Sequence, residues 1–79
     1  MDEIQEMVAN IAGKCLGMGA GELGPDDDLR AVGLTSLRMV ELMTELEERL
    51  SIEFPDEIIE VGTFGSVRSL ADSVRRLAS

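Results

Sequence analysis

The chain has 79 residues, a length that suits one small core, and we expect a single domain over residues 1–79. Its 16 acidic and 7 basic residues give a formal net charge of −9, which disfavours nucleic acid and anionic membranes as partners and favours proteins that present Lys and Arg. With no histidine and one cysteine, the chain lacks a Ser-His-Asp triad, a Cys-His pair and an ordinary zinc site. We therefore expect a protein that is not an enzyme and binds no metal. We also expect it to be a monomer.

The sequence also indicates a cellular compartment. Cys15 is the only cysteine, so no internal disulfide can form, which fits a reducing environment. No run of about 18 apolar residues is present, and the chain opens with the acidic Met1-Asp2-Glu3, where a secretory signal is basic. We expect a cytoplasmic protein.

A first amphipathic helix is predicted over about residues 3–16. Its apolar residues recur at helical spacing and fall on one face: Ile4, Met7, Val8, Ile11 and Cys15. Because Cys15 belongs to this face, we interpret it as a small buried hydrophobe and not as a reactive thiol.

Residues 17–34 are predicted to form a long loop, because a helix there is opposed by Pro25 and by Gly17, Gly19, Gly21 and Gly24. A long loop in a small domain needs anchors. The apolar residues that can provide them are Leu23, Leu29, Val32 and Leu34.

The acidic run at residues 26–28 within this loop suggests a calcium site, but the spacing does not fit an EF-hand. Arg30 stands at the fifth position, and Leu37 stands at the twelfth, where a bidentate Glu is needed. We therefore do not assign a calcium site.

A second helix is predicted over about residues 36–50. On a helical wheel, its core side carries Met39, Leu42, Met43, Leu46 and Leu50. The opposite side carries Leu37, Glu41, Thr44 and Glu48. Leu37 is therefore an apolar residue on an outward, acidic face.

The rest of the chain predicts two further helices. Pro55 and the acids after it open a short third helix over residues 56–61, which Gly62 ends. Ser66 opens a fourth helix with an apolar stripe of Val67, Leu70, Ala71, Val74 and Leu77. The predicted fold is all-α, a small four-helix bundle of three longer helices and one short one, with a long loop between the first two.

The segment Gly33-Leu34-Thr35-Ser36-Leu37 places a serine hydroxyl where the long loop turns into the second helix. A phosphate esterified to Ser36 would lie at the positive end of the helix dipole. Serine before an apolar run is also a common N-cap, and for Ser36 alone this interpretation stays open. Thr35 is itself a competent cap, which would leave Ser36 exposed.

The residues that follow extend this pattern. Val40-Glu41-Leu42 and Leu46-Glu47-Glu48 lie on the same helix, and Phe54-Pro55-Asp56-Glu57 comes after it. With residues 33–37, they resemble the phosphopantetheine-attachment motif of acyl carrier proteins in order and spacing, over nearly the whole chain. The resemblance implies an acyl-carrier-like bundle with 4'-phosphopantetheine bound covalently to Ser36.

The resemblance also implies a docking surface on the second helix, made of Leu37, Val40, Glu41, Glu47 and Glu48. Its partners would be a phosphopantetheinyl transferase and synthases, acyltransferases or ligases with cationic surfaces. From the residues alone, a solvated helix face explains these charges as well.

In carrier proteins of this shape, the space between the second and third helices can shelter the thioester-bound chain. The candidates to line such a pocket are Met39, Met43, Leu46, Phe54, Ile58, Ile59 and Val61. Their alternative role is core packing, which we expect for most of them.

Two residues depart from the family pattern. Thr35 stands where Asp usually precedes the modified serine, and Arg38 stands where an acidic or polar residue is common. Arg38 opposes the helix dipole, although it could neutralise an attached phosphate. Both departures favour a specialised pathway, such as antibiotic biosynthesis.

We therefore expect a carrier that shuttles thioester-bound acyl intermediates of fatty acid or polyketide biosynthesis. One alternative is a peptidyl or aminoacyl carrier of a non-ribosomal pathway. Another is an acidic helical adaptor without a prosthetic group, in which Ser36 is a cap or a phosphorylation site.

Overall fold

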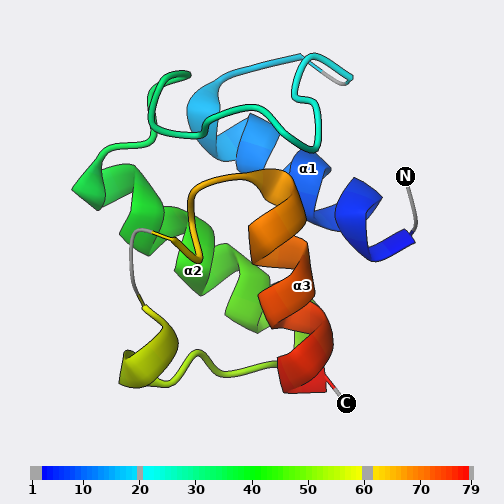
Figure 1. Ribbon diagram of the computed structural model, residues 1–79, viewed down its shortest axis with the longest axis vertical. Helices are drawn as coiled ribbons and strands as arrows, with labels where there is room; N and C mark the ends of the chain where they lie inside the picture. The colour runs from blue at the N-terminus through cyan, green and yellow to red at the C-terminus, as the bar shows by residue number, and fades with distance from the viewer. Residues whose placement is uncertain (1–2, 20, 60–61, 79) are drawn as a thin grey trace.

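The computed structural model describes residues 3–19, 21–59 and 62–78. In these ranges the chain forms three α-helices and no strand: α1 (Glu3–Leu16), α2 (Ser36–Leu50) and α3 (Val67–Ala78). One turn of 3-10 helix, η1 (Asp56–Ile58), lies between α2 and α3. Helix α1 packs against both other helices, and the long loop after it crosses one end of the bundle (Figure 1).

The structure confirms the predicted bounds of α1 and α2 and the all-helical class. The last helix starts at Val67, and Ser66 is its cap: Ser66 Oγ accepts a hydrogen bond from the Ser69 N–H, and Ser69 Oγ accepts one from the Ser66 N–H, both at 3.2 Å. This exchange is a capping box in which Ser69 takes the place of Glu.

The expected count of four helices is not confirmed, because the segment after Pro55 forms only the single 3-10 turn. A few residues gain too little from one or two hydrogen bonds to nucleate an α-helix without support from packing. Residues 60 and 61, at the end of the expected helix, lie outside the described residues.

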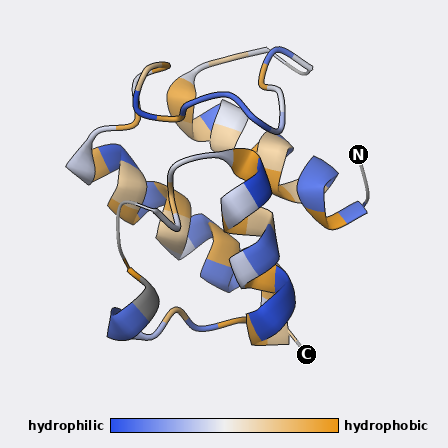
Figure 2. Cartoon of the chain, in the orientation of Figure 1, coloured by the Kyte–Doolittle hydropathy of each residue, from blue (hydrophilic) through white to orange (hydrophobic). Residues whose placement is uncertain are grey.

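One core joins the helices and their connections. Its buried apolar side chains are Val8, Ile11, Ala12, Leu23, Leu29, Leu34, Leu42, Leu46, Phe54, Phe64, Val67, Leu70, Ala71 and Val74. Polar residues lie on the outer side of α3, and hydrophobic residues turn toward the other helices (Figure 2). The connections are therefore part of the core, with the rings of Phe54 and Phe64 5.8 Å apart between centroids.

The long loop is tied to the start of α3. The Leu29 N–H donates to the Gly65 carbonyl and the Arg68 N–H donates to the Pro25 carbonyl, each at 2.9 Å. The Arg68 guanidinium also bonds both carboxylate oxygens of Asp26, at 2.7 and 3.0 Å. These contacts, with the buried anchors Leu23, Leu29 and Leu34, fix the loop that leads to Ser36. Val32 is only half-buried.

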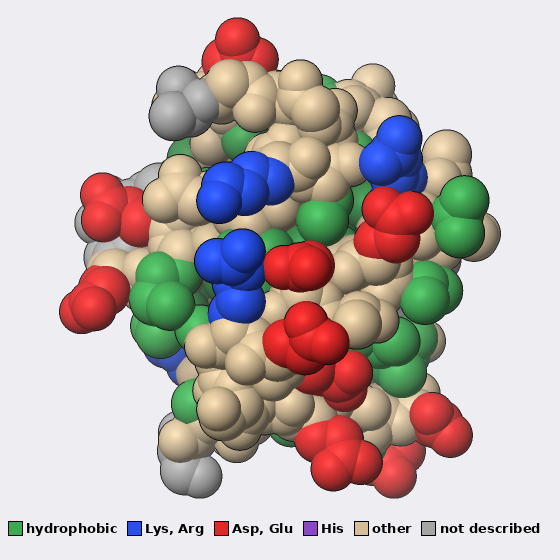
Figure 3. All heavy atoms as spheres, turned by 180° about the vertical axis from the view of Figure 1, so that it is seen from behind, with side chains coloured by type: hydrophobic (Ala, Val, Ile, Leu, Met, Phe, Trp, Pro, Cys, Tyr) green, Lys and Arg blue, Asp and Glu red, His purple; other side chains and the backbone are tan. Residues whose placement is uncertain are grey.

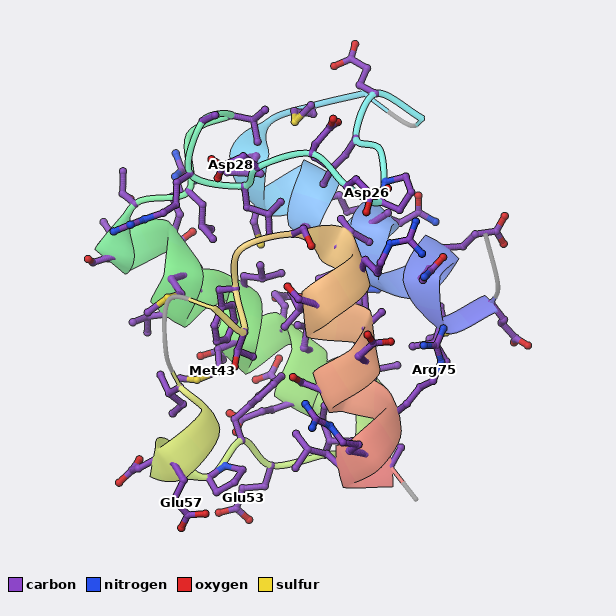
Figure 4. The ribbon with its side chains drawn as sticks, in the orientation of Figure 1. Asp26, Asp28, Met43, Glu53, Glu57 and Arg75 are labelled. Atoms are coloured by element: carbon purple, nitrogen blue, oxygen red, sulfur yellow. The ribbon has the colours of Figure 1, made fainter. Side chains whose placement is uncertain are left out.

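The acidic run of this loop has structural partners. Asp27 accepts a bond from the Gly24 N–H at 2.7 Å, and Asp28 accepts one from the Arg30 N–H at 3.0 Å. Asp26 lies by α3, well away from Asp28 (Figure 4). The part of the chain that the structure describes holds no cluster of three or more potential metal ligands. Within it, no helix has the length and apolar character needed to cross a bilayer.

Candidate functional site

Ser36 is the first residue of α2, and its side chain is exposed. The turn before it requires glycine, because Gly33 has φ +113°, in a region that side chains with a Cβ rarely adopt. Leu34 is buried, and its N–H donates to the Leu29 carbonyl at 2.9 Å. The loop is thus anchored two residues before the serine, which holds Ser36 at the surface.

Thr35 caps α2. Its backbone is extended (φ −88°, ψ 172°), and its Oγ1 accepts a hydrogen bond from the Arg38 N–H at 3.2 Å. The Ser36 hydroxyl forms no hydrogen bond with any described residue, so the interpretation of Ser36 as the cap is wrong. The hydroxyl that sequence reasoning singled out is free for another role.

The surroundings of Ser36 favour an anion. The first turn of α2 contains no acidic residue, and the N–H groups that open a helix form its positive end. A small hollow of about 90 Å³ lies beside the serine. The residues around this hollow are Arg30, Leu34, Thr35, Ser36, Met39 and Phe64.

Arg38 points away from this hollow. Residues two apart on a helix lie on nearly opposite sides, and the Arg38 guanidinium reaches α1, where it donates to the Cys15 carbonyl at 3.0 Å. The same nitrogen lies 3.5 Å from Glu41 Oε2. Arg38 therefore ties α2 to the end of α1, and the suggestion that it neutralises a phosphate on Ser36 finds no support in this geometry.

Cys15 is half-buried and packs against the core. Burial, with a smaller contribution from the negative charges of Glu45 and Glu41, raises the pKa of its thiol above the usual value. A raised pKa keeps the thiol protonated near neutral pH, in agreement with the interpretation of Cys15 as a packing residue.

The docking candidates differ in exposure. Leu37 and Val40 are large apolar side chains that are 70% and 50% exposed, and Glu41 and Glu48 are exposed as well. Glu47 is half-buried, and one of its oxygens accepts a hydrogen bond from the Phe54 N–H at 2.9 Å. Glu47 therefore fastens the chain that leaves α2, a structural task that the sequence did not reveal.

The exposed charges near α2 are of both signs. A hollow of about 520 Å³ lies between α1 and α2, and the residues around it are Ile11, Lys14, Cys15, Val40, Glu41, Thr44, Glu45 and Arg49. Seen from the side opposite to Figure 1, basic side chains lie among the acidic ones (Figure 3). The surface is thus less uniformly acidic than the net charge suggests.

The candidates for an acyl pocket fall into two groups. Leu46 and Phe54 are buried in the core, at 0% and 5% exposure, where they act in packing. Met39, Met43 and Ile59 are half-buried at its edge, and Figure 4 shows Met43 between α2 and η1. The side chain of Ile58 and the whole of Val61 lie outside what the structure describes.

Comparisons with known proteins find a matching family model and similar carrier and synthase sequences. A family model described as a phosphopantetheine attachment site matches residues 4–74. An aminoacyl carrier protein of Agrobacterium fabrum is 38% identical over 53 residues, which cover 67% of this chain and 64% of that protein. Polyketide synthase ThaQ of Burkholderia thailandensis is 39% identical over 61 residues, which cover 75% of this chain and 3% of the synthase. The chain thus spans less than two thirds of the length of both relatives.

Solved structures show the same fold. One similar chain comes from the crystal structure of an engineered Bradyrhizobium japonicum glycine:[carrier protein] ligase complexed with carrier protein from Agrobacterium tumefaciens and ATP. It has a TM-score of 0.83 and 30% identity, and the match covers 94% of this chain and 99% of that one. An active-site mutant of a peptidyl carrier protein, solved in solution, has a TM-score of 0.83 at 16% identity, with 100% of this chain and 83% of that chain covered. At this identity, the second match supports the fold alone.

Proposed function

Because the chain belongs to the phosphopantetheine attachment site family, we propose that Ser36 is the residue that carries the prosthetic group. The observation that carries this assignment is the exposed Ser36 hydroxyl at the start of α2. Because Thr35 caps this helix, the Ser36 hydroxyl is not needed as a cap. The anchored loop, the left-handed turn at Gly33 and the absence of an acidic residue from the first turn of α2 add support. Among the described residues, neither the first turn of α2 nor the lining of the hollow beside Ser36 contains an acidic side chain that would repel a phosphodiester.

The attachment is a group transfer from coenzyme A, catalysed by a phosphopantetheinyl transferase. A bond forms between Ser36 Oγ and phosphorus, the phosphoanhydride bond of coenzyme A breaks, the nucleotide leaves, and the hydroxyl proton passes to a base of the transferase. When bound, the group supplies a thiol that forms thioesters with carboxylic acids. The chain supplies position, and the partner enzymes supply catalysis.

We propose a small aminoacyl group as the first candidate cargo. Leu46 and Phe54, two of the residues expected to line an acyl pocket, are closed into the core, which favours a cargo that needs no shelter. The likeness to an aminoacyl carrier protein and to a chain from a glycine:[carrier protein] ligase complex points the same way. An acyl group of the fatty acid or polyketide type is the second candidate, supported by the likeness to a polyketide synthase.

The docking surface proposed for partners consists of Leu37, Val40, Glu41 and Glu48, with Glu47 assigned a structural role. Two exposed apolar side chains next to Ser36 provide an anchor, and the carboxylates steer encounter with cationic groups. Lys14, Arg38 and Arg49 lie close by, so a partner that fits this surface needs acidic groups among its basic ones.

Loading of the apo protein tests the attachment site. With coenzyme A and a phosphopantetheinyl transferase, the wild-type protein is expected to gain the mass of one prosthetic group, and Ser36→Ala is expected to gain none. Ser51→Gly is the matched control, because Ser51 is another exposed serine at the far end of α2, and its φ of 53° suits glycine. Loading of Ser36→Ala, or failure of Ser51→Gly to load, would refute the assignment.

The cargo is tested on the loaded protein. With ATP, glycine and a glycine:[carrier protein] ligase, we expect an added glycyl mass that mild alkaline hydrolysis removes. Addition of malonyl or acetyl groups by an acyltransferase, with no aminoacyl addition by any of several ligases, would reverse the order of the two candidates.

A further inference from the structure

The hollow beside Ser36 is small. Its volume of about 90 Å³ leaves room for a compact group such as a phosphate. Apolar side chains of Leu34, Met39 and Phe64 form part of its lining. Arg30 is the basic residue of that lining, so a cation from the loop borders the same hollow as the attachment serine.

Arg30 is free to bind an anion. It is exposed, and it forms no ion pair with a residue that the structure describes. Among the described arginines, Arg38, Arg49, Arg68 and Arg75 pair with a carboxylate, whereas Arg30 and Arg76 do not. By contrast, Arg38, the other arginine close to Ser36 in sequence, is engaged with Cys15 and Glu41.

The backbone of Arg30 is held in place. Its N–H donates to Asp28 Oδ1 at 3.0 Å, and its carbonyl accepts from the Gly33 N–H at 3.2 Å. The preceding residue, Leu29, is fully buried and bonded to Gly65. Pairing with a group on Ser36 would therefore order the side chain of Arg30 and not its backbone, which limits the entropy lost on pairing.

We infer that Arg30 is a positioning residue for the attached arm, pairing its guanidinium with the phosphodiester on Ser36. This inference rests on the proposed attachment at Ser36. Guanidinium groups bind phosphate oxygens through paired, charge-assisted hydrogen bonds, and the hollow gives the phosphate a place between loop and helix. The pairing directs the arm toward the Arg30 side of α2 and away from the Arg38 side.

The test compares loaded wild-type protein with loaded Arg30→Gln, Arg30→Lys and Arg38→Gln. Intact mass first establishes loading, and thermal unfolding of each apo form establishes folding. The phosphorus-31 NMR resonance then reports the surroundings and mobility of the phosphodiester, and the Nε–H resonance of Arg30 reports its partner. Neither signal depends on the activity of a partner enzyme.

We expect the Arg30 Nε–H resonance to shift on loading and to move back as salt is added, because an exposed ion pair is screened. In Arg30→Gln the phosphorus resonance is expected to shift and narrow relative to the wild type. Arg30→Lys, which keeps the positive charge, is expected to have a phosphorus resonance between those of Arg30→Gln and the wild type. Arg38→Gln is expected to match the wild type. Identical phosphorus spectra for wild type and Arg30→Gln would overturn the inference while leaving the attachment site intact. A change in the KM for loading without a spectral change would also overturn it, since Arg30 would then contact the transferase. Absence of loading at Ser36 would overturn both proposals.

Discussion

The guanidinium of Arg38 donates a hydrogen bond of 3.0 Å to the backbone carbonyl of Cys15, 23 residues earlier in the chain. Cys15 lies in the last turn of α1, where carbonyl groups have no partner within the helix and carry the negative end of the dipole. One side chain thus joins the end of α1 to the start of α2, two residues from Ser36. The positive charge of Arg38 opposes the dipole of α2, its own helix, but it lies at the negative end of the α1 dipole.

Arg38→Ala is expected to lower the free energy of unfolding by about 0.5–1.5 kcal/mol, the usual net contribution of such a bond. Arg49→Ala is the control, because the one described residue with which Arg49 forms an ion pair is Glu45, one turn away on α2. Its loss is expected to change stability by about 0.3–0.5 kcal/mol. Urea unfolding of both variants checks the comparison. Equal losses would show that the contact between α1 and α2 adds nothing.

Asp26 makes stability depend on acid pH. Its hydrogen bond from Arg68 holds the pKa of this carboxyl below the ordinary value of 3.8. A carboxyl with a depressed folded-state pKa contributes stability that is present above the unfolded-state pKa and is lost as pH falls through the folded-state pKa. Asp26→Asn is therefore expected to be less stable than wild type at neutral pH, with a difference that shrinks as pH falls below about 4.

Thermal unfolding across this pH range measures the difference. In an Arg68→Gln background, Asp26→Asn should change little at any pH, because the partner that lowers the pKa is gone. A stability difference that persists unchanged in strong acid, or that survives in the Arg68→Gln background, would argue against the ion pair as its source.

The same substitution is expected to have opposite effects at two glycines. Gly33→Ala forces a Cβ onto a residue at φ +113° and should destabilise by about 1 kcal/mol or more. Gly13→Ala places a Cβ inside α1 at an ordinary contact distance of 3.9 Å from the Met18 carbonyl oxygen, and should stabilise by about 0.5–1 kcal/mol. Chemical denaturation of the two variants measures the change in the free energy of unfolding for each. A stabilised Gly33→Ala would contradict the turn geometry before Ser36.

Two neighbouring glutamates on α2 are expected to behave differently. Glu47→Ala removes the acceptor of the partly buried Phe54 N–H and should destabilise by about 1 kcal/mol. Glu48→Ala removes an exposed carboxylate and should stay within about 0.5 kcal/mol of wild type. For association with a cationic partner, Glu48→Ala should slow the on-rate. Equal stability of the two variants would remove the structural role assigned to Glu47.

Local signals made the helices predictable. The apolar spacing of Leu42 and Leu46 placed the inner side of α2, and the Thr35 side chain fixed its start. These patterns depend on residues three or four apart, which the sequence displays directly. The exposure of Ser36 followed from the same reasoning, because a helix that Thr35 caps leaves the next residue at the surface.

Contacts between distant segments were not predictable in this way. The pairing of Asp26 with Arg68 spans 42 residues, and nothing in the order of residues marks those two as partners. The same holds for Arg38 with Cys15. Helical geometry alone could have shown that Arg38 lies on the side of α2 opposite to Ser36. The one-turn η1 depended on packing that a run of a few acidic and apolar residues does not specify.

The most direct test of the central claim is fragmentation mass spectrometry of the wild-type protein after incubation with coenzyme A and a phosphopantetheinyl transferase. The structure predicts one added group, with the modified fragments placing it on Ser36 and leaving Thr35 unmodified. An unmodified Ser36, or a group found on any other residue, would contradict the account.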